Sequence, residues 1–529
     1  MVSQSSQPGT SAADMIFAGN VADVVARAAT AGPDHPALVE PARGISLTWA
    51  EVHAAVDAES VRLRGAGVRP GDRVLVRLGH GVAFCVALLG AVRADAIAVP
   101  VGTNAVEREL DLIVADSAPS VIVAAESDRA VASVAGQRSI RVIAAPDPRP
   151  AADPGSVEPC GRRGEDIAVL GYTSGSTGTP RGVRLSHRAL LANRAQTALL
   201  RPVPVSPADR ALLQLPLFHI YGLGAGLLGV CWAGATGVLA DRMTPVELVE
   251  LIAAERISVL AGIPSTYRAL LELPAARLRE ALVTVRLCAA GGAPLPKDLP
   301  RAFQNATGLP LYDGYGLTET GPVLTSTLVS GVVKPGSVGR PLPGGPGVPG
   351  VQLRVAGAGD DEDEFAEEQD GEFDPDLDTG LVEVRGPNLF SGYWPDGAGG
   401  PDEDGWFRTS DVGYLDADGD LHLVDRATDL VIVNGFNVYP HEVEQVLTAH
   451  PQIVEAAVVG VPDERTGEAV KAVLVVRPGA ELTAEQVREH CAVRLARFKL
   501  PTVVEFVDAL PRSATGKIAR MELRAGRRA

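Results

Sequence analysis

Strand-like apolar runs alternate with helix-like stretches along the chain, and this alternation restricts the fold more than any other feature. Apolar runs begin at Arg73, Ala96 and Val121, and a helix-like stretch separates each from the next. Parallel strands need such crossovers, and strands covered on both faces are apolar throughout. The pattern therefore predicts an α/β fold whose large N-terminal domain has doubly wound sheets, and a similar series from Asp209 to Leu311 extends it.

Short strands with glycine turns replace this pattern between Val351 and Val424. Asp418-Gly419 stands between two apolar runs and is a strong hairpin signal. We expect a small β-barrel or distorted sheet to close the large domain here. The C-terminal part returns to mixed strands and helices, including a helix for which Thr483 is a suitable N-cap, and this predicts a small α+β domain.

These changes of sequence pattern along the chain predict a domain organisation. We expect a disordered N-terminus at 1–14, a large N-terminal domain at 15–425 with a disordered acidic insert at about 357–379, a hinge at 426–429 and a mobile C-terminal domain at 430–529. The insert carries twelve acidic residues and no Lys or Arg, against a net charge of −17 for the chain. The rest of the protein is therefore only mildly acidic, and no nucleic-acid partner is expected. A partner-binding role for the insert stays open.

Cysteine usage and hydropathy indicate a cytoplasmic protein. The five cysteines form no Cys-x-x-Cys pair, which argues for a reducing compartment and against a disulfide framework or a zinc site. The N-terminus lacks the basic and apolar regions of a secretory signal. The uncharged run Tyr221–Ala240 has the length of a bilayer span, but glycines interrupt it, so we interpret it as a buried helix and strand. No transmembrane segment is expected, while peripheral membrane contact stays open.

A loop rich in glycine and hydroxyl groups follows the apolar run 167–170. It reads Tyr-Thr-Ser-Gly-Ser-Thr-Gly-Thr-Pro-Arg-Gly from Tyr172 to Gly182. Its glycines let backbone N–H groups point at phosphate oxygens, and its hydroxyls add donors, although taken alone it could also be a plain surface turn. The loop is neither a Walker loop nor a nucleophile elbow, because neither spacing is met. It predicts an ATP site made by Thr173, Ser174, Gly175, Ser176, Thr177, Gly178 and Arg181.

Four further blocks follow this loop in order. They are Asp313-Gly-Tyr-Gly-Leu-Thr-Glu-Thr320, Gly405-Trp-Phe-Arg-Thr-Ser-Asp411, Asp425-Arg-Ala-Thr-Asp-Leu-Val-Ile-Val-Asn-Gly435 and Pro511-Arg-Ser-Ala-Thr-Gly-Lys517. With these blocks the chain resembles the adenylate-forming (AMP-binding) superfamily of acyl-CoA synthetases, nonribosomal-peptide adenylation domains and luciferases. The resemblance extends from about Asn20 to Leu523, and Gly435-Phe-Asn-Val-Tyr-Pro440 is most similar to bacterial fatty-acyl-CoA synthetases.

The resemblance implies an ATP-dependent acyl-CoA synthetase. A carboxylic acid and MgATP would give an acyl-adenylate and pyrophosphate, the C-terminal domain would rotate, and the thiol of coenzyme A, a co-substrate, would displace AMP. Small residues at positions such as Gly222, Gly224 and Gly226 are compatible with a roomy tunnel for a medium- or long-chain fatty acid, or with backbone packing alone. An acyl-AMP ligase that loads a carrier protein is the alternative, and a non-catalytic nucleotide-binding protein is a remote one.

Site residues follow from the resemblance, position by position. The expected catalytic residues are Lys517, which would bridge the carboxylate and the α-phosphate, Thr318, Glu319, which would also bind Mg²⁺, and His219, which would border the acid pocket. Beyond the loop, the expected residues that bind the nucleotide or coenzyme A are Gly291, Gly292, Ala293, Asp313, Gly314, Tyr315, Gly316, Asp411, Arg426 and Gly435.

Two positions depart from the family's pattern. Arg181 stands where the family's loop usually has lysine, and Thr428 stands where the hinge usually has Asp or Lys. Arginine is the default cation of this chain, because only five of its 48 basic residues are lysine. Lys517 is notable against that background, since a compact ammonium acts differently from a planar guanidinium.

Overall fold

The computed structural model describes residues 12–149, 157, 160–173, 180–357, 379–426, 429–433, 436–463, 465–495, 497–512 and 518–524. The chain divides into two compact units. The first unit comprises residues 1–353 and 384–407, and the second comprises residues 354–383 and 408–529. Almost all of the predicted disordered N-terminus and acidic insert, most of the glycine-rich loop and the middle of the predicted hinge lie outside the described residues.

The predicted alternation of strands and helices is confirmed in a six-stranded sheet of the first unit. Its order is β6-β5-β3-β4-β7-β8. All neighbours are parallel except β7 and β8. The strands are β3 (Arg73–Arg77), β4 (Ile97–Pro100), β5 (Val121–Ala124), β6 (Arg141–Ile143), β7 (Ile167–Thr173) and β8 (Arg181–Ser186), and the crossovers are α4 (Val82–Arg93), α5 (Glu107–Ser117) and α6 (Arg129–Arg138).

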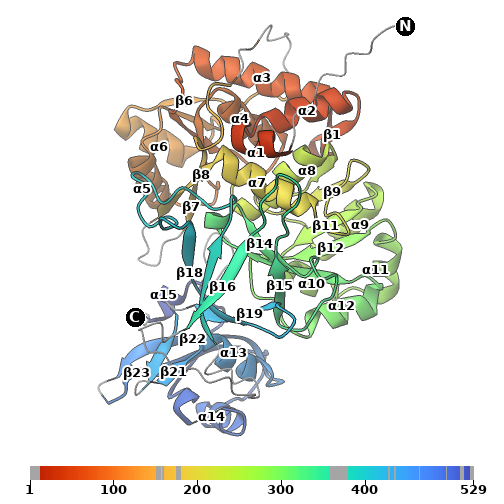
Figure 1. The fold of residues 1–529 in the computed structure, drawn as a ribbon. Coiled ribbons are helices and arrows are strands. Elements are labelled where there is room, and N and C mark those ends of the chain that lie inside the picture. Colours follow the sequence, from red (N-terminus) through yellow and green to blue (C-terminus); the bar gives the residue numbers. More distant parts are fainter. Residues whose placement is uncertain are drawn as a thin grey trace. The chain divides into compact units, whose positions relative to one another are not determined.

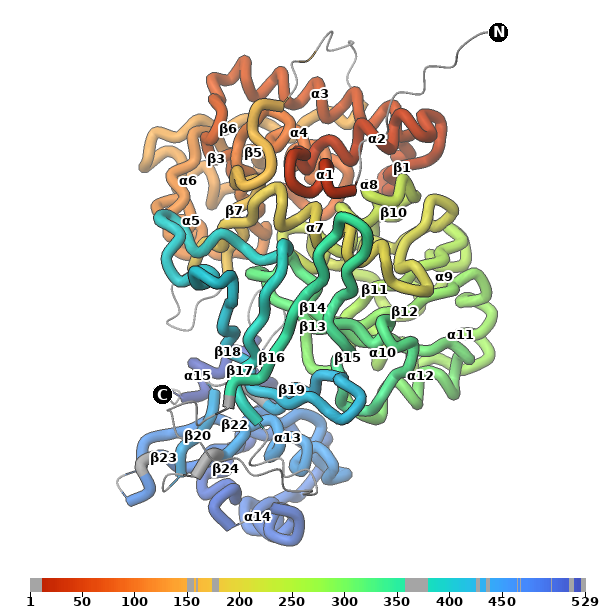
Figure 2. Tube along the Cα trace, in the orientation of Figure 1, coloured from red at the N-terminus to blue at the C-terminus, as the bar shows by residue number. Residues whose placement is uncertain are grey.

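A second sheet in the first unit follows the order β15-β14-β13-β12-β11-β9-β10-β1-β2. Its central strands are parallel, and β14, β15 and β2 run antiparallel to their neighbours. Figure 2 shows β13, β14 and β15 side by side. The strands are β1 (Pro36–Glu40), β2 (Ile45–Thr48), β9 (Arg210–Leu213), β10 (Thr236–Leu239), β11 (Val259–Gly262), β12 (Leu287–Ala290), β13 (Leu311–Gly316), β14 (Val323–Ser326) and β15 (Ser337–Pro341).

Helices accompany this second sheet. α9 (Pro245–Ala254), α10 (Pro264–Leu270), α11 (Ala275–Ala281) and α12 (Leu299–Thr307) lie beside β11 and β12 (Figure 1). The other helices of the first unit are α1 (Ala12–Ala18), α2 (Asp23–Ala31), η1 (Pro41–Arg43), α3 (Trp49–Gly65), α7 (His187–Ala198), η2 (Tyr221–Leu228), α8 (Gly229–Ala233) and η3 (Thr318–Thr320). The run Tyr221–Ala240 is thus helix followed by strand, as predicted, and η2 is a π-helix. Among the described helices, none combines the length and apolarity needed to cross a membrane.

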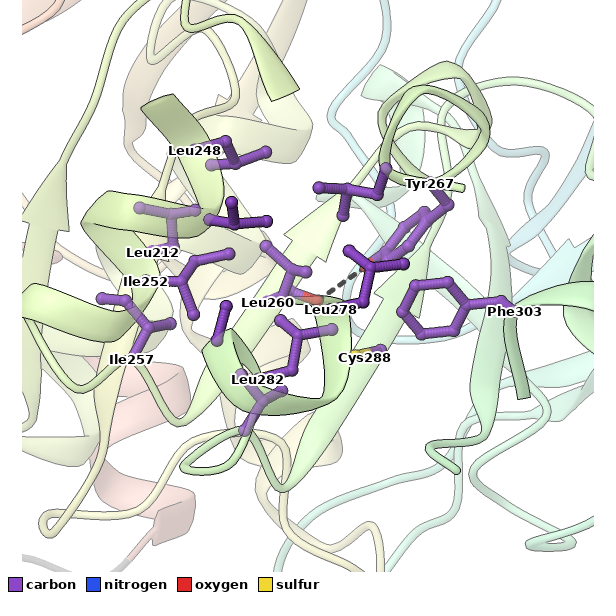
Figure 3. Packing of buried hydrophobic residues seen from close by; sticks show 14 of the residues in the cluster. Leu212, Leu248, Ile252, Ile257, Leu260, Tyr267, Leu278, Leu282, Cys288 and Phe303 are labelled. Carbon is purple, nitrogen blue, oxygen red and sulfur yellow. Dashed lines mark hydrogen bonds between the residues drawn. The ribbon is translucent and has the colours of Figure 1, made fainter. Parts of the chain in front are cut away.

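An apolar core fills the space between β11, β12 and the helices α9 to α12 (Figure 3). Tyr267 and Phe303 are fully buried in it, with ring centroids 5.1 Å apart in an edge-to-face arrangement. The Tyr267 hydroxyl donates to the Leu260 carbonyl at 2.8 Å, so its polar atom is satisfied inside the core. This core fixes the carboxyl ends of β11 and β12, which carry residues of the predicted site.

The second unit contains two groups of strands. β16 (Gln352–Gly357), β17 (Gly380–Arg385), β18 (Trp406–Leu415) and β19 (Leu421–Arg426) are neighbours in that order. The predicted hairpin is confirmed, since β18 and β19 are antiparallel and Gly419 in their turn has φ 80°. A five-stranded sheet joins β20 (Val431–Val433), β21 (Phe436–Val438), β22 (Ile453–Asp463), β23 (Gly467–Val476) and β24 (Val503–Phe506).

Helices α13 (Pro440–Thr448), α14 (Ala484–Ala492), η4 (Arg497–Lys499) and α15 (Arg520–Arg524) complete the second unit. Thr483 caps α14 in a capping box with Gln486, as the sequence predicts. Helix α13 begins at Pro440, which occupies its first turn, after β21 has ended at Val438.

We predict that Phe303→Ala destabilises the first unit by about 3–5 kcal/mol, because a buried ring is lost and a cavity remains. Val283→Ala is the matched control, since Val283 is 81% exposed and its loss should change little. Differential scanning calorimetry of the two variants provides the comparison. Equal melting temperatures would contradict the packing described.

Candidate active site

The glycine-rich loop is held between two paired strands. Thr173 ends β7 and Arg181 begins β8, and the two residues are opposite each other in the antiparallel ladder. A second strand, β8, therefore follows the loop directly. Ser174, Gly175, Ser176, Thr177 and Gly178 lie outside the described residues. The structure fixes both ends of the loop at one edge of the six-stranded sheet.

Arg181 and Glu319 meet at Tyr393. The Tyr393 hydroxyl donates to Glu319 Oε1 at 2.9 Å, and the Arg181 guanidinium lies over the Tyr393 ring, 3.4 Å from its centroid. Burial and the Glu319 carboxylate raise the pKa of the Tyr393 phenol, so it stays protonated and donates. A cation over the face of the ring and a carboxylate at its hydroxyl group are thereby held beside the exit of the loop.

The segment that carries Tyr393 is tied to β8. The Arg184 amide donates to the Gly392 carbonyl at 3.1 Å, and the Trp394 amide donates to the Gly182 carbonyl at 2.8 Å. On the other side, the Phe390 amide donates to the Glu319 carbonyl at 2.9 Å. Backbone hydrogen bonds therefore connect this segment both to the loop's exit strand and to the turn that bears Glu319.

Thr318 and Glu319 occupy η3, directly after β13. A side chain on Gly171 of β7 would meet the Thr318 methyl group at 3.1 Å, so η3 lies against the strand that enters the loop. Gly316 admits no side chain, because the Pro322 carbonyl fills that space. The structure thus brings Thr318, Glu319 and both ends of the loop together.

Gly291 and Gly292 follow β12, and Tyr221 covers them. A side chain on Gly291 would meet the Tyr221 ring at 3.2 Å and the Gly314 carbonyl at 3.3 Å. Gly292 has φ +78°, a conformation that residues with a side chain rarely adopt. The backbone here can therefore approach a flat ligand closely. Ala293 continues this turn, and Tyr315 is buried in β13.

Asp313 is a buried carboxyl group next to this glycine turn. It is 7% exposed, and its Oδ1 accepts a hydrogen bond from the Gly314 amide at 2.8 Å. Burial raises the pKa of Asp313 to about 7, although the Gly314 amide acts in the opposite direction. Burial and the charge of Asp313 also raise the pKa of Tyr221. Asp313 and Tyr221 therefore share one poorly solvated environment.

His219 precedes the π-helix η2 and is half-buried. Its Nδ1 accepts a hydrogen bond from the Tyr221 amide at 3.2 Å, and its backbone amide donates to the Pro216 carbonyl at 3.0 Å. His219 is thus oriented at the end of η2 that carries Tyr221. Its role at the edge of an acid pocket stays a prediction.

Two predicted nucleotide contacts lie in the second unit. Asp411 and Arg426 are opposite each other in the ladder of β18 and β19, so the structure brings their backbones together. Asp411 belongs to a strand and not to a turn, and it is 6% exposed. Gly435 and Lys517 lie outside the described residues.

The described residues on either side of Lys517 are well anchored. Arg512 and Ile518 flank the stretch 513–517 and form an antiparallel bridge. Arg520 donates to the buried carboxylate of Glu444 through Nη1 at 2.6 Å and Nη2 at 3.0 Å. Elsewhere in the second unit, Lys471 pairs with Glu505 and Lys499 pairs with Glu442. Lys471 and Lys499 therefore each have a carboxylate partner within the second unit.

The sequence reasoning missed Tyr221 and Tyr393. Tyr221 begins an apolar run and was not singled out, although its position two residues after His219 could have indicated that it belongs to the site. Tyr393 stands in Ser-Gly-Tyr-Trp-Pro, far from Glu319 in sequence, and no spacing rule connects the two. Only the backbone pairing with β8 places it in the site.

We predict that Asp313→Asn stabilises the protein at pH 8 and has less effect at pH 5. The Asp313 pKa is higher in the folded than in the unfolded chain, so between about pH 4 and 7 the folded state holds a proton that the unfolded state has released. Stability from this carboxyl therefore falls as pH rises through that window and stays low above it. Asparagine has no charge to bury, and its advantage at pH 8 should be on the order of 1–3 kcal/mol.

The measurement is the melting temperature of both proteins at several pH values without nucleotide. Taking the difference between the two proteins removes the contribution of every other titrating group. A difference that does not change between pH 5 and pH 8 would contradict the assigned pKa.

Comparison with known proteins agrees with this geometry. Residues 25–394 match the family model of the AMP-binding enzyme, and residues 442–517 match that of the AMP-binding enzyme C-terminal domain. The chain is 36% identical over 489 residues to a protein named feruloyl-CoA synthase from Amycolatopsis, covering 91% of this chain and 94% of the relative. It is 32% identical over 521 residues to long-chain-fatty-acid–CoA ligase FadD13 from Mycobacterium tuberculosis, covering 96% and 98%.

Solved structures of AMP-binding enzymes have the same fold as this chain. The crystal structure of ATP-bound MatB from Rhodopseudomonas palustris superposes with a TM-score of 0.84 at 33% identity, covering 96% of this chain and 98% of that one. The predicted fold class is therefore confirmed. The chain belongs to the family of AMP-binding enzymes and is an acid–thiol ligase.

Proposed function

We propose that this protein is an ATP-dependent acyl-CoA synthetase that activates a medium- or long-chain carboxylic acid through an acyl-adenylate and transfers it to coenzyme A. The family match supports the adenylate-forming step, and the relatives named as CoA ligases support the acceptor. An acyl-AMP ligase that loads a carrier protein is the alternative, and the choice of acceptor distinguishes the two.

The contact of Arg181 and Glu319 through Tyr393 carries the proposal. Joining a carboxylate to the α-phosphate concentrates negative charge, so the site needs cations, hydrogen-bond donors and a metal near the loop. Arg181 begins the strand that leaves the loop, and Glu319 Oε1 lies 2.9 Å from the hydroxyl of Tyr393, whose ring Arg181 covers. The structure therefore groups the donors and the carboxylate that this reaction needs.

The donor set suits Mg²⁺. This ion prefers oxygen ligands and is usually held by one or two carboxylates together with substrate phosphates. Tyr393 occupies only one oxygen of Glu319, and the Thr318 hydroxyl is the next donor along η3. Glu319 would hold the ion, which when bound would neutralise charge on the phosphates. Thr318 would donate to the α-phosphate.

The other roles divide between the two half-reactions. Asp411 would accept bonds from the ribose hydroxyls, with Arg426 beside it in the ladder. Asp313 and the turn at Gly291 and Gly292 would border the adenine. Lys517, the last residue matched by the C-terminal family model, would bridge the carboxylate and the α-phosphate during adenylation. Gly435 would line the passage of the coenzyme A thiol after rotation of the C-terminal domain.

The packing of η2 supports a medium- or long-chain acid as the substrate. Gly222 and Gly224 have no room for a side chain, because the Pro216 carbonyl and the Pro322 ring lie against them. Backbone packing thus accounts for these two glycines. Gly226 and Gly229 remain partly exposed, although a side chain on Gly226 would meet the Leu213 side chain at 3.3 Å, so the more open position is Gly229. An extended acyl chain along this face is consistent with the relatives named for long-chain fatty acids and for ferulate.

The direct test measures pyrophosphate release from ATP with graded fatty and aryl acids, with and without coenzyme A. The proposal expects release that depends on the acid, and an acyl-CoA product. Adenylate formation without any thioester of coenzyme A would favour the carrier-protein ligase. Absence of release with every acid would rule out the synthetase.

We predict that Tyr393→Phe weakens MgATP binding about 3- to 30-fold, because the charged Glu319 carboxylate loses the hydrogen bond that the Tyr393 hydroxyl donates. The phenylalanine ring keeps the stacking on Arg181. Isothermal titration calorimetry at varied Mg²⁺ concentration measures the binding constant without turnover. Tyr267→Phe is the control, since it removes a hydroxyl group that donates to the Leu260 carbonyl and not to Glu319. Equal MgATP affinity in all three proteins would exclude this role for Tyr393.

We predict that Lys517→Ala and Gly435→Leu damage different half-reactions. Lys517→Ala should slow adenylate formation roughly 100-fold or more, since one preorganised cation is lost, while supplied acyl-adenylate is still converted to thioester. Gly435→Leu should adenylate almost normally and fail in thioester formation. Single-turnover pyrophosphate release and thioester formation from added adenylate are measured for each variant. Equal losses in both steps for both folded variants would refute the two-conformation mechanism.

A further inference from the structure

Arg194 is a buried guanidinium that pairs with no carboxylate among the described residues. It lies on α7, is 4% exposed, and its Nη2 donates to the side-chain oxygen of Asn193. Its Nε has no hydrogen-bond partner, and within the described part of the chain no acidic side chain pairs with it. Burial alone lowers the pKa of Arg194 to about 9. The neutral Asn193 amide is thus the one polar group found to hold this cation among the described residues.

Such an arrangement is costly for the free protein. Removing a charged group from water without a counter-charge costs several kcal/mol, and buried arginines are nearly always paired with an acid. The other buried arginine of this unit with comparable exposure follows that rule, because Arg77 pairs with Asp128 at 2.8 Å and donates to three carbonyl groups. Arg194 therefore has no counter-charge in the part of the chain that the structure describes, and an anionic ligand could supply one.

Arg194 lies at the far end of the face that Tyr221 begins. Its Nη1 is 3.6 Å from the position of a side chain on Gly229. Along η2 and into α8, Tyr221, Ala225, Gly226 and Gly229 are partly exposed, whereas Gly222, Leu223, Gly224, Leu227 and Leu228 are buried. Residues about four positions apart share one side of a helix. One partly open face therefore runs from Tyr221 to the Arg194 guanidinium.

The length of this face sets the size of a ligand that spans it. Tyr221 and Gly229 are eight positions apart, which at about 1.5 Å per residue corresponds to at most roughly 12 Å. Tyr221 marks the end of the face next to the glycine turn and His219, where the reacting carboxylate is proposed to bind. A medium-length acid with its far end at Gly229 would reach Arg194.

We propose that Arg194 binds a second carboxylate at the far end of the acid, so that the preferred substrate is a medium-chain α,ω-dicarboxylic acid. This inference rests on the proposed acyl-CoA synthetase activity and narrows its substrate class. The ω-carboxylate supplies the counter-charge and accepts hydrogen bonds from the unoccupied nitrogen atoms of the guanidinium. The apolar chain between the two carboxylates lies along Ala225, one turn from Tyr221 and one turn from Gly229.

The test compares octanedioic acid with octanoic acid, which have the same length and differ only at the far end. Pyrophosphate release gives kcat/KM for each acid in the wild-type protein, in Arg194→Met and in Arg194→Lys. We expect the wild type to prefer the diacid. Arg194→Met should lower the ratio of diacid to monoacid kcat/KM roughly 10- to 100-fold, since a hydrogen-bonded charge pair is lost. Arg194→Lys should retain part of the preference, because it keeps the charge without the planar fork.

The outcomes separate this inference from the proposed function. If no acid releases pyrophosphate, the synthetase proposal itself fails. If octanoic acid is activated and the ratio is the same in wild type and in folded Arg194→Met, the cation is structural and the inference is wrong while the synthetase stands. Wild-type protein alone gives a second test, independent of how the variants fold. Equal kcat/KM for the two acids, or any preference for octanoic acid, would overturn the assignment of Arg194, since a paired charge should favour the diacid about tenfold or more.

Discussion

Buried hydrogen bonds around Thr320 hold the turn that carries Glu319, and the rest of the site depends on them. The Thr320 hydroxyl accepts from the Leu317 amide at 2.9 Å, and the Thr320 carbonyl accepts from the Asn388 side chain at 2.9 Å. The bond from Asn388 is buried and the bond from the Leu317 amide is partly buried, and an unpaired polar group away from water would cost about 1–3 kcal/mol. The turn therefore has one low-energy arrangement, and Glu319 is fixed before any ligand binds.

The same network explains how distant segments reach one place. Asn388 comes from the segment that continues to Tyr393, and Asn193 comes from α7, where its side chain donates to the Val323 carbonyl at 2.6 Å. The Glu319 turn is thus held from both sides by amide side chains that are themselves fully buried. Arg194 follows Asn193 directly and donates to its side-chain oxygen. One helix turn therefore supports the proposed metal ligand and presents the proposed binding group for the acid.

Local sequence patterns predicted the fold well because each expresses a local physical preference. The apolar runs at β3, β4 and β5 needed cover on both faces, and Thr483 had the hydroxyl that an N-cap requires. The grouping of Thr318 and Glu319 with the ends of the loop followed from a resemblance, and the structure places these residues together. Tyr393 and Arg194 could not be predicted, because their importance lies in contacts between residues far apart in sequence. The sequence of an arginine-rich chain does not distinguish a buried arginine from one on the surface.

The two faces of η2 show why the reaction and the choice of acid can be set by different residues. On the packed face, Gly222 and Gly224 are required by backbone atoms that press against them, so this face is fixed by the fold. On the partly exposed face, no backbone atom lies as close to Gly226 or Gly229 as to Gly222 and Gly224, although the Leu213 side chain would lie 3.3 Å from a side chain on Gly226. η2 is a π-helix, and such wide helical turns are rare and frequently occur at functional sites. Substitutions on the open face can therefore alter the acid that fits without disturbing the turn that holds Glu319.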